Sequence, residues 1–286
     1  MNKTWTVADI LKTTCDFFGR KGLTSPRLEA ELLLSEVMSL SRVQLYVNFE
    51  RILTAAEVDA YRELVRRRAN HEPAAYILGR KEFYRLNFTV TKDTLIPRPE
   101  TEHLVDEALK LAKKFPPDLP IADLGCGSGA ISLSLARNLP QARIAAVDLS
   151  PEALAVAEKN ALNLKVAGRV EFLLGDLAQP LSGRTFSLIC ANLPYVPTED
   201  LPALPPDVAL YEPKPALDGG PRGLGLYRRL LPEVPGLLEA GGYILMEIWP
   251  PSLDELNGLI VQAGLSPAGV LKDYGQQSRV VTAQKL

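Results

Sequence analysis

The glycine-rich stretch IADLGCGSGA, at residues 121–130, has residue types suited to ligand chemistry. It follows an apolar run typical of a buried strand and precedes a helical pattern. Gly125, Gly127 and Gly129 let the backbone turn tightly and let a ligand approach without a Cβ in the way. The start of the following helix adds free N–H groups and the positive end of the helix dipole. The stretch therefore predicts a nucleotide-type binding site.

Acidic residues after the next two strand runs indicate how a nucleoside would be held. Asp148 ends the second run, where a carboxylate can accept hydrogen bonds from both ribose hydroxyls and would repel a 2′-phosphate. The alternative role of Asp148 is a helix cap, for which Ser150 is the better candidate. Asp176 and Leu177 follow the third run, where the acid can accept from an adenine amino group and the leucine can cover the ring.

The acid before the glycines, Asp123, separates the possible cofactors. Gly125, Gly127 and Ala130 satisfy the dinucleotide spacing, whereas the absence of a following Gly-Lys-Ser/Thr excludes a P-loop. The pyrophosphate of NAD is anionic and would be opposed by Asp123. The ammonium and sulfonium groups of S-adenosylmethionine would be favoured. Asp123 can instead accept from the amides of its own loop, and both roles are compatible.

A second motif, ANLPYVP at residues 191–197, follows the fourth strand run. It resembles the N/D-P-P-Y motif of DNA adenine and protein-glutamine methyltransferases. An amide nitrogen is a poor nucleophile, because its lone pair is delocalised into the carbonyl. The Asn192 side-chain oxygen and the Leu193 backbone carbonyl can accept its N–H groups and direct the lone pair at a sulfonium methyl. Pro194 keeps Leu193 extended, and Tyr195 can stack on the amide near the cationic sulfur, so positioning is the main contribution.

Segments along nearly the whole chain resemble the HemK/PrmC-type peptide chain release factor N5-glutamine methyltransferases. The most specific is LIPRPETE at residues 95–102, which includes Arg98 and Glu100, because many methyltransferases have the glycine loop and few have this segment. The other matching segments are RLEAELLL at 27–34, EPAAYILG at 72–79, Glu212-Pro213, ALDGG at 216–220, and Asp273 with Arg279-Val280-Val281.

The resemblance implies an α/β fold, with a Rossmann-like class I methyltransferase sheet and a small N-terminal all-α domain. The implied reaction transfers a methyl group from S-adenosylmethionine to the side-chain amide nitrogen of the glutamine in the Gly-Gly-Gln motif of class 1 peptide chain release factors. The expected cofactor-binding residues are Asp123, Gly125, Cys126, Gly127, Ser128, Gly129, Asp148, Asp176, Leu177 and Asn192. The expected catalytic residues are Asn192, Leu193, Pro194 and Tyr195, which would bind the substrate together with Arg98 and Glu100.

Departures from the family pattern leave other functions open. Leu193 replaces the usual first proline, but its backbone carbonyl is retained, so activity is expected to survive. Ser187 replaces the usual aspartate, and Trp249-Pro250 stands where glycine is usual. The alternatives are a ribosomal-protein glutamine methyltransferase, an amino-methyltransferase acting on nucleic acid, a binding module that has lost catalysis, and an NAD oxidoreductase.

Composition narrows the class of protein. The 32 Lys+Arg and 34 Asp+Glu residues give a net charge of −2, which argues against a broad basic face and stable nucleic-acid binding. Three cysteines and two histidines predict no disulfide framework and no metal site. The sequence has no apolar run of membrane-spanning length, and charged residues interrupt any signal-peptide core near the N-terminus. We expect a cytoplasmic chain without membrane partners.

Hydrophobic periodicity changes character along the chain and predicts the domains. Residues 1–82 are expected to form a helical substrate-recognition domain, with no strand run before Asn87; the basic run Arg66–Arg68 is either a solvated helix end or a docking patch. Residues 83–114 would form a linker hairpin and helix, and 115–286 the catalytic domain. Residues 197–223 are expected to be a long proline-rich loop over a site.

Strands and helices are expected to alternate in the catalytic domain, which predicts a mostly parallel sheet. The predicted strands are Ile121–Leu124, Arg143–Leu149, Val170–Leu174, Phe186–Ala191, Tyr243–Ile248, Gly269–Leu271 and Arg279–Ala283. The predicted helices are Ala130–Asn138, Pro151–Leu164, Leu224–Leu238 and Leu253–Ala263.

Overall fold

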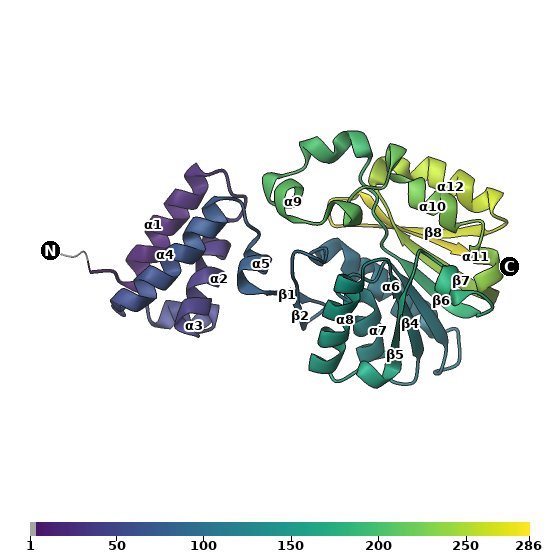
Figure 1. Ribbon diagram of the computed structural model, residues 1–286, viewed down its shortest axis with the longest axis horizontal. Helices are drawn as coiled ribbons and strands as arrows, with labels where there is room; N and C mark the ends of the chain where they lie inside the picture. The colour runs from purple at the N-terminus through teal and green to yellow at the C-terminus, as the bar shows by residue number, and fades with distance from the viewer. Residues whose placement is uncertain (1–3) are drawn as a thin grey trace. The chain divides into compact units, whose positions relative to one another are not determined.

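The structure is a computed structural model that describes residues 4–286. The chain divides into two compact units. The first comprises Met1–Gly79 and Pro206–Tyr211, and the second comprises Arg80–Pro205 and Glu212–Leu286. Figure 1 shows the helices and strands of the two units. Each unit has hydrophobic core residues of its own.

The first unit is helical. Its helices are α1 (Val7–Arg20), α2 (Pro26–Met38), α3 (Arg42–Val47), α4 (Ala55–Ala69), α5 (Ala74–Leu78) and α9 (Pro206–Tyr211). Thr54 and Glu57 form a reciprocal capping box at the start of α4. The core is formed by apolar faces that include Phe18, Leu33 and Tyr61.

The basic run at the end of α4 is paired within the first unit. Arg66 and Arg67 form ion pairs with nearby glutamates. Arg68 is only 2% exposed; its guanidinium contacts Glu29 at 2.6 Å and Asp207 of α9 at 3.4 Å. The expectation of a solvated helix end is therefore wrong for Arg68, because its cation holds helices together instead of facing water.

The second unit begins with an antiparallel hairpin, which the sequence predicts only in part. Strand β1 (Arg80–Phe83) pairs with β2 (Leu86–Thr89), so a strand does precede Asn87. The charged sequence of β1 hides it, since only Phe83 of its four residues is buried. A 3-10 turn, η1 (Pro99–Thr101), then leads into α6 (Glu102–Ala112).

A seven-stranded sheet forms the centre of the second unit. Its strand order is β5-β4-β3-β6-β7-β9-β8, and it is parallel from β5 to β7, while β9 pairs antiparallel with both β7 and β8. The strands are β3 (Pro120–Leu124), β4 (Arg143–Asp148), β5 (Val170–Leu174), β6 (Phe186–Ala191), β7 (Leu238–Glu247), β8 (Ser266–Lys272) and β9 (Ser278–Gln284).

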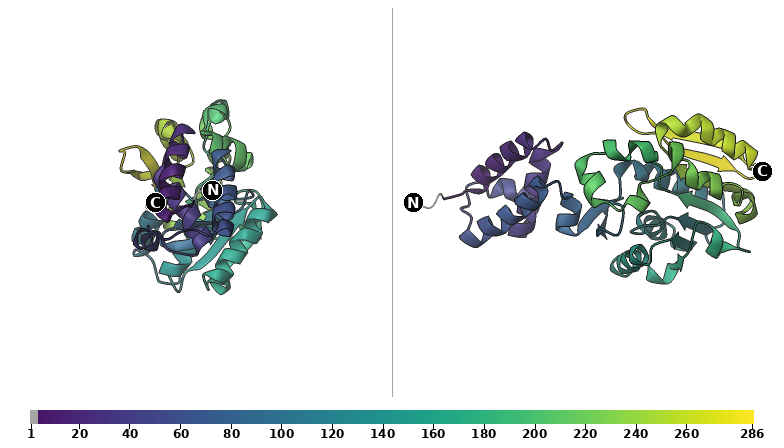
Figure 2. Two further views of the ribbon diagram at one scale, coloured as in Figure 1. Left: turned by 90° about the vertical axis from the view of Figure 1, so that its left-hand side faces the viewer. Right: turned by 45° about the horizontal axis from the view of Figure 1, so that its top comes forward.

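Helices cover both faces of this sheet (Figures 1 and 2). One face packs against α6, α7 (Ala130–Asn138) and α8 (Pro151–Asn163). The opposite face packs against α10 (Gly225–Leu230), α11 (Val234–Leu237) and α12 (Leu253–Gln262). Neighbouring residues of one strand, such as Ile121 and Ala122, belong to different cores, which explains why the strand runs are apolar on both faces. The helix expected over Leu224–Leu238 is instead two shorter ones.

The proline-rich segment 197–223 is not structureless. It contains the 3-10 turns η4 (Thr198–Ala203), η5 (Lys214–Ala216) and η6 (Pro221–Gly223), with α9 between them. It returns to its own start, because Val196 N donates to Leu217 O at 3.0 Å and Gly219 N donates to Val196 O at 2.8 Å. Proline fixes the first turn of such short helices, so the pattern that suggests a loop also fits this series of turns.

Candidate active site

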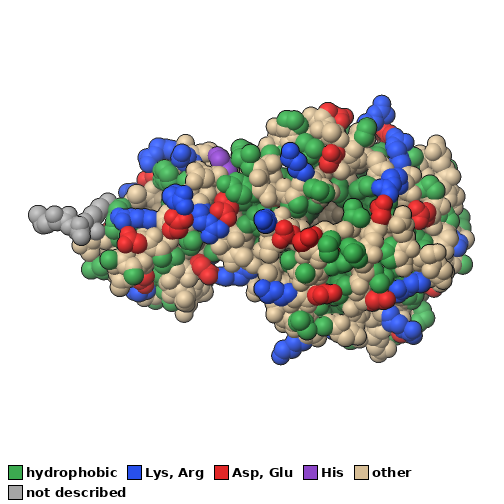
Figure 3. Space-filling model, viewed as in Figure 1, with side chains coloured by type: hydrophobic (Ala, Val, Ile, Leu, Met, Phe, Trp, Pro, Cys, Tyr) green, Lys and Arg blue, Asp and Glu red, His purple; other side chains and the backbone are tan. Residues whose placement is uncertain are grey.

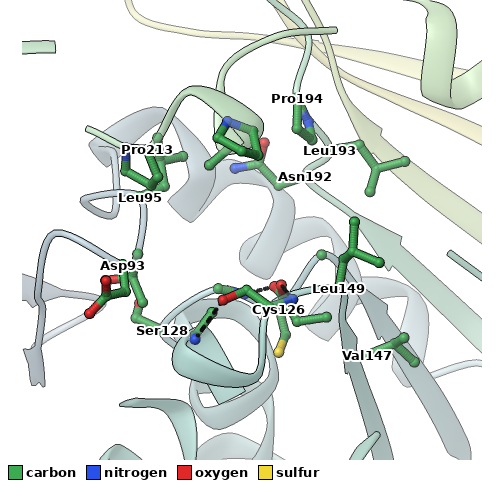
Figure 4. A pocket seen from close by; sticks show the side chains of 18 of the residues that line it. Asp93, Leu95, Cys126, Ser128, Val147, Leu149, Asn192, Leu193, Pro194 and Pro213 are labelled. Carbon is green, nitrogen blue, oxygen red and sulfur yellow. Dashed lines mark hydrogen bonds between the residues drawn. The ribbon is translucent and has the colours of Figure 1, made fainter. Parts of the chain in front are cut away.

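A cavity of about 640 Å³ lies where the predicted motifs meet. It is lined by the glycine loop, by residues after β4, β5 and β6, and by the segment before η1. This is the carboxyl end of the parallel strands, where open α/β sheets bind ligands. Figure 4 shows Asn192, Leu193 and Pro194 on one side of the cavity and Cys126 and Ser128 across from them.

The glycine loop is held by the end of β4. Gly125 N and Cys126 N donate to Val147 O at 2.9 and 3.0 Å, and Gly127 N donates to Oδ2 of Asp148 at 2.7 Å. Gly125 has φ +71°, and a Cβ there would lie 3.1 Å from the Leu193 side chain, so any other residue would be strained at this position.

Asp148 and Ser150 divide the roles that the sequence left open. Ser150 Oγ caps α8 by accepting from Ala153 N at 3.1 Å. Asp148 lines the cavity, and its Oδ1 accepts from Ser150 N at 3.0 Å. Each carboxylate oxygen has further lone pairs, so Asp148 can still accept hydroxyl groups of a ligand.

Asp123 is fully buried and does not line the cavity. Its Oδ2 accepts from Ser132 N at 2.9 Å, whereas Oδ1 has no hydrogen-bond partner. Burial raises the pKa of Asp123 to about 7, and the charge of Asp148 adds to the rise. In the structure Asp123 therefore accepts from an amide near its own loop, as one of its two expected roles requires. A cation that bound in the cavity would favour the charged form of Asp123.

The expected adenine subsite contains a residue that the sequence did not single out. Asp176 and Leu177 line the cavity, as does Arg229 of α10. The guanidinium of Arg229 forms an ion pair of 2.5 Å with Asp176. Arg229 therefore competes with any amino group for that carboxylate.

The side chain of Asn192 is oriented by Thr101. Asn192 Nδ2 donates to Thr101 Oγ1 at 3.2 Å, across 91 positions of sequence. Within residues 4–286 no hydrogen bond reaches Oδ1 of Asn192, and this oxygen is not among the buried polar atoms without partners, so it remains accessible. Since Asn192 lines the cavity, its free oxygen is available to an N–H donor there.

Tyr195 does not line the cavity, although Asn192, Leu193 and Pro194 do. Its hydroxyl donates to Oε1 of Glu247, at the end of β7, at 3.0 Å. Glu247 is 1% exposed, and burial raises its pKa to about 6. Burial beside this carboxyl also raises the pKa of Tyr195, so its hydroxyl stays protonated and remains a donor.

The backbone around Tyr195 is braced by the returning proline-rich segment and by α10. A Cβ on Gly223, which has φ +70°, would lie 1.9 Å from the carbonyl oxygen of Tyr195. A Cβ on Gly219 would lie 2.7 Å from the carbonyl oxygen of Pro194. Tyr227 of α10 is fully buried, and its hydroxyl lies within hydrogen-bond distance of Glu247 O at 2.6 Å and of Ala191 O at 3.1 Å, so it links the ends of β6 and β7.

The two substrate residues expected in LIPRPETE are placed differently. Arg98 lines the cavity and forms an ion pair with Glu212, whose side chain is 1% exposed and which also accepts from Ile96 N at 3.1 Å. Glu100 does not line the cavity. Its negative charge acts on the buried carboxyl of Glu247 and raises the pKa of that group.

The structure thus brings together most of the predicted site. The cavity is lined by Gly125, Cys126, Gly127, Ser128, Asp148, Asp176, Leu177, Asn192, Leu193, Pro194 and Arg98. Residues expected in the site that do not line it are Asp123, Gly129, Tyr195 and Glu100. Residues of the site that sequence reasoning missed are Thr101, Tyr227, Arg229 and Glu247. Of these four residues, only Thr101 could have been suspected from the sequence, because it lies inside the PRPETE segment.

The fold and this cavity define a methyltransferase of the Rossmann-like class. Residues 121–209 match the family model described as a methyltransferase domain, and residues 9–79 match the PrmC N-terminal domain. A methyltransferase structure from Pyrococcus furiosus aligns over 70% of this chain and 89% of its own, with a TM-score of 0.51 and 16% identity, which supports the fold.

The chain belongs to the release factor glutamine methyltransferase family. It is 42% identical to the member from Geobacter sulfurreducens, over 97% of this chain and 96% of the relative. It is 39% identical to the member from Rhodopirellula baltica, over 98% and 97%, and 43% identical to the member from Moorella thermoacetica, over 92% and 93%.

Two features are absent from the described residues 4–286. No helix among them is long and apolar enough to cross a membrane. No group of three or more His, Cys, Asp or Glu side chains among them could hold a metal ion.

Proposed function

We propose that this chain transfers a methyl group from S-adenosylmethionine to the side-chain amide nitrogen of the glutamine in the Gly-Gly-Gln motif of class 1 peptide chain release factors. One observation carries the proposal: Asn192, with an accessible amide oxygen, lines the same cavity as the glycine loop and Asp148. The family to which the chain belongs supports glutamine as the acceptor.

The cavity residues fit S-adenosylmethionine. Asp148 can accept from the ribose hydroxyls, Leu177 can cover the adenine, and Asp176 can accept its amino group once Arg229 is displaced or shares the carboxylate. The buried, unpaired Oδ1 of Asp123 favours a ligand that places positive charge near the glycine loop. When bound, the cofactor supplies an electrophilic methyl group on a sulfonium.

The chain's own residues orient the acceptor amide. Asn192 Oδ1 and the carbonyl of Leu193 would each accept one N–H of the glutamine amide, which turns the nitrogen lone pair toward the methyl group. Pro194 holds Leu193 out of the helical region, so that carbonyl is fixed. Leucine in place of the usual proline keeps the carbonyl. Such positioning can contribute several kcal/mol to lowering the barrier, since it removes the orientational entropy from the reaction step.

The helical first unit is proposed to recognise the release factor in the cytoplasm. Stable nucleic-acid binding is not expected, because the net charge is −2. On the face shown in Figure 3, basic and acidic side chains are interspersed, without a continuous basic surface.

The test is mass spectrometry of a class 1 release factor purified from cells that lack this activity. It would be incubated with the chain and S-adenosylmethionine, then digested. We expect one added methyl group on the Gly-Gly-Gln glutamine, and none on a release factor with that glutamine replaced by alanine. Absence of transfer with intact cofactor binding would contradict the proposal. Ribosomal protein and adenine-containing DNA would then be tested as acceptors in the same assay.

A further inference from the structure

The amide of Asn192 can face the cavity in two ways, and only one suits the reaction proposed above. A primary amide has an acceptor oxygen and a donor nitrogen of nearly equal size. The acceptor glutamine also presents N–H donors. If Asn192 turned its own Nδ2 to the cavity, two donors would face each other and the glutamine would not be held.

Thr101 alone does not decide this orientation. Its hydroxyl contacts Asn192 Nδ2 at 3.2 Å. A hydroxyl can both donate and accept, so it could equally bind the oxygen of a rotated Asn192 amide. The orientation is fixed only if the hydroxyl proton of Thr101 is used elsewhere.

Glu247 is the group that can take this proton. Its carboxyl is buried at the end of β7, and Oε1 accepts from Tyr195 while Oε2 has no hydrogen-bond partner. No hydrogen bond joins Thr101 to this unpaired oxygen in the structure, but the Thr101 hydroxyl lies close enough to the carboxyl to lower its pKa. An ionised carboxylate can only accept, so Glu247 would leave the oxygen of Thr101 with only an accepting role.

We propose, on the basis of the function proposed above, that ionised Glu247 is a positioning residue. In this arrangement its unpaired Oε2 accepts a hydrogen bond from the Thr101 hydroxyl, so Thr101 can only accept from Asn192 Nδ2. The Asn192 oxygen is then left facing the cavity. The other oxygen of Glu247, Oε1, accepts from the Tyr195 hydroxyl. This contact holds Tyr195 and the backbone that follows Leu193 and Pro194. Glu247 does not line the cavity and acts only through these neighbours.

Protonation of Glu247 would release this constraint. A protonated carboxyl can donate to Thr101, which would then donate to the oxygen of a rotated Asn192. Burial and the charge of Glu100 raise the pKa of Glu247 to about 6, whereas Thr101, Tyr195 and the charge of Arg279 lower it. Among titratable groups Tyr227 also faces this carboxyl, and its own pKa is raised by burial and by Glu247. Turnover is therefore expected to fall as the pH drops below about 6.

Glu247→Gln mimics the protonated state, because its amide nitrogen can donate to Thr101. We expect it to lower kcat at about pH 8 by about 10- to 100-fold, with the KM for S-adenosylmethionine nearly unchanged, since only acceptor positioning is lost. Thr101→Val should cause a similar loss, and Thr101→Ser, which keeps the hydroxyl, should restore most of it. Glu239→Gln is the matched control, because Glu239 lies at the other end of β7 and accepts from Ser187 at 2.7 Å.

A readout independent of the release factor separates the two proposals. In the protein labelled with ¹⁵N, the side-chain amide signal of Asn192 should shift with pH, with a midpoint near 6. This shift should be absent in Glu247→Gln and retained in Glu239→Gln. The positioning role would be overturned if Glu247→Gln turned over as fast as an active wild type. It would also be overturned if the Asn192 signal titrated identically in the wild type and in Glu247→Gln. No methyl transfer by the wild-type chain, with the Asn192 titration present, would overturn the proposed function and leave the hydrogen-bond network standing.

Discussion

The two sides of the cavity are built in different ways. The glycine-loop side consists of Gly125–Ala130 and Asp148, which are close in sequence and bind each other through backbone N–H groups. The Asn192 side consists of Asn192–Tyr195 and depends on partners from distant segments, such as Thr101 and Glu247. Nucleotide binding can therefore be encoded in local motifs, whereas the orientation of an acceptor amide needs partners from the whole sheet.

The largest effect is expected at the Asn192 side. Asn192→Ala should lower kcat by roughly 10²–10³, the range observed when one preorganised hydrogen-bonding group is removed from an active site. The Kd for S-adenosylmethionine, measured by calorimetry, should change little. Asn138→Ala, in a helix away from the cavity, is the control. A parallel loss of cofactor affinity would break the separation between the two sides.

Gly223→Ala tests the bracing of the Asn192 side. The new Cβ would lie 1.9 Å from the Tyr195 carbonyl oxygen at φ +70°, so the Pro194–Tyr195 backbone must move. We expect kcat to fall by about 10- to 100-fold, since small misplacements of positioning groups have effects of this size. Gly236→Ala has open space around its Cβ and serves as the control. Equal kcat values for the two variants would show that this backbone is not critical.

Asp148→Ala tests the glycine-loop side. It removes the acceptor for ribose hydroxyls and for Gly127 N. Cofactor binding should weaken by roughly 1.5–3 kcal/mol, the contribution of a hydrogen bond to a charged group. At saturating cofactor, kcat should stay near the wild-type value. The exposed Asp118 provides the control substitution Asp118→Ala. A lower kcat at saturation would mean that the two sides are coupled.

Asp123 makes the stability of the free protein depend on pH. Its pKa is raised from 3.8 to about 7, so the folded chain binds a proton that the unfolded chain has released between these values. Stability should therefore fall as the pH rises through this range, by about 1.4 kcal/mol per pH unit. Chemical denaturation should show a steeper fall of stability with pH in the wild type than in Asp123→Asn. Identical slopes in the two proteins would exclude Asp123 as the cause.

The smallest effect concerns the rim of the glycine-loop side. Arg229 pairs with Asp176, but its side chain is 54% exposed, so the pair contributes about 1 kcal/mol or less. Arg229→Ala frees the carboxylate and should tighten cofactor binding by up to about fivefold at low salt, and less at high salt. Arg228→Ala is the control, because Arg228 pairs with Glu255 and does not line the cavity. Weaker binding in Arg229→Ala would show that the arginine itself contacts the cofactor.

The sequence by itself determined the strands of the seven-stranded sheet, the glycine loop and the Asn192 motif. Strands β5 and β6 and helix α7 begin and end at the predicted residues. Their signals are local: apolar runs of strand length, glycine spacing, and proline after Leu193. Since parallel strands end at one edge of the sheet, these motifs were also expected to meet there, and they line one cavity.

Only the tertiary structure decided which side chains hold the motif residues in place. Thr101, Tyr227 and Glu247 come from separate elements. Thr101 contacts Asn192, Glu247 contacts Tyr195, and Tyr227 contacts the backbone of Ala191 and Glu247, which follows from the neighbouring positions of β6 and β7 in the sheet and from the packing of α10. Thr101 and Asn192 are 91 positions apart, so no local sequence pattern predicts the hydrogen bond between them. Strand β1 could not be recognised from its charged sequence either, because it forms by pairing with β2. Nor could the sequence show that the hydroxyl of Tyr195 is turned to Glu247.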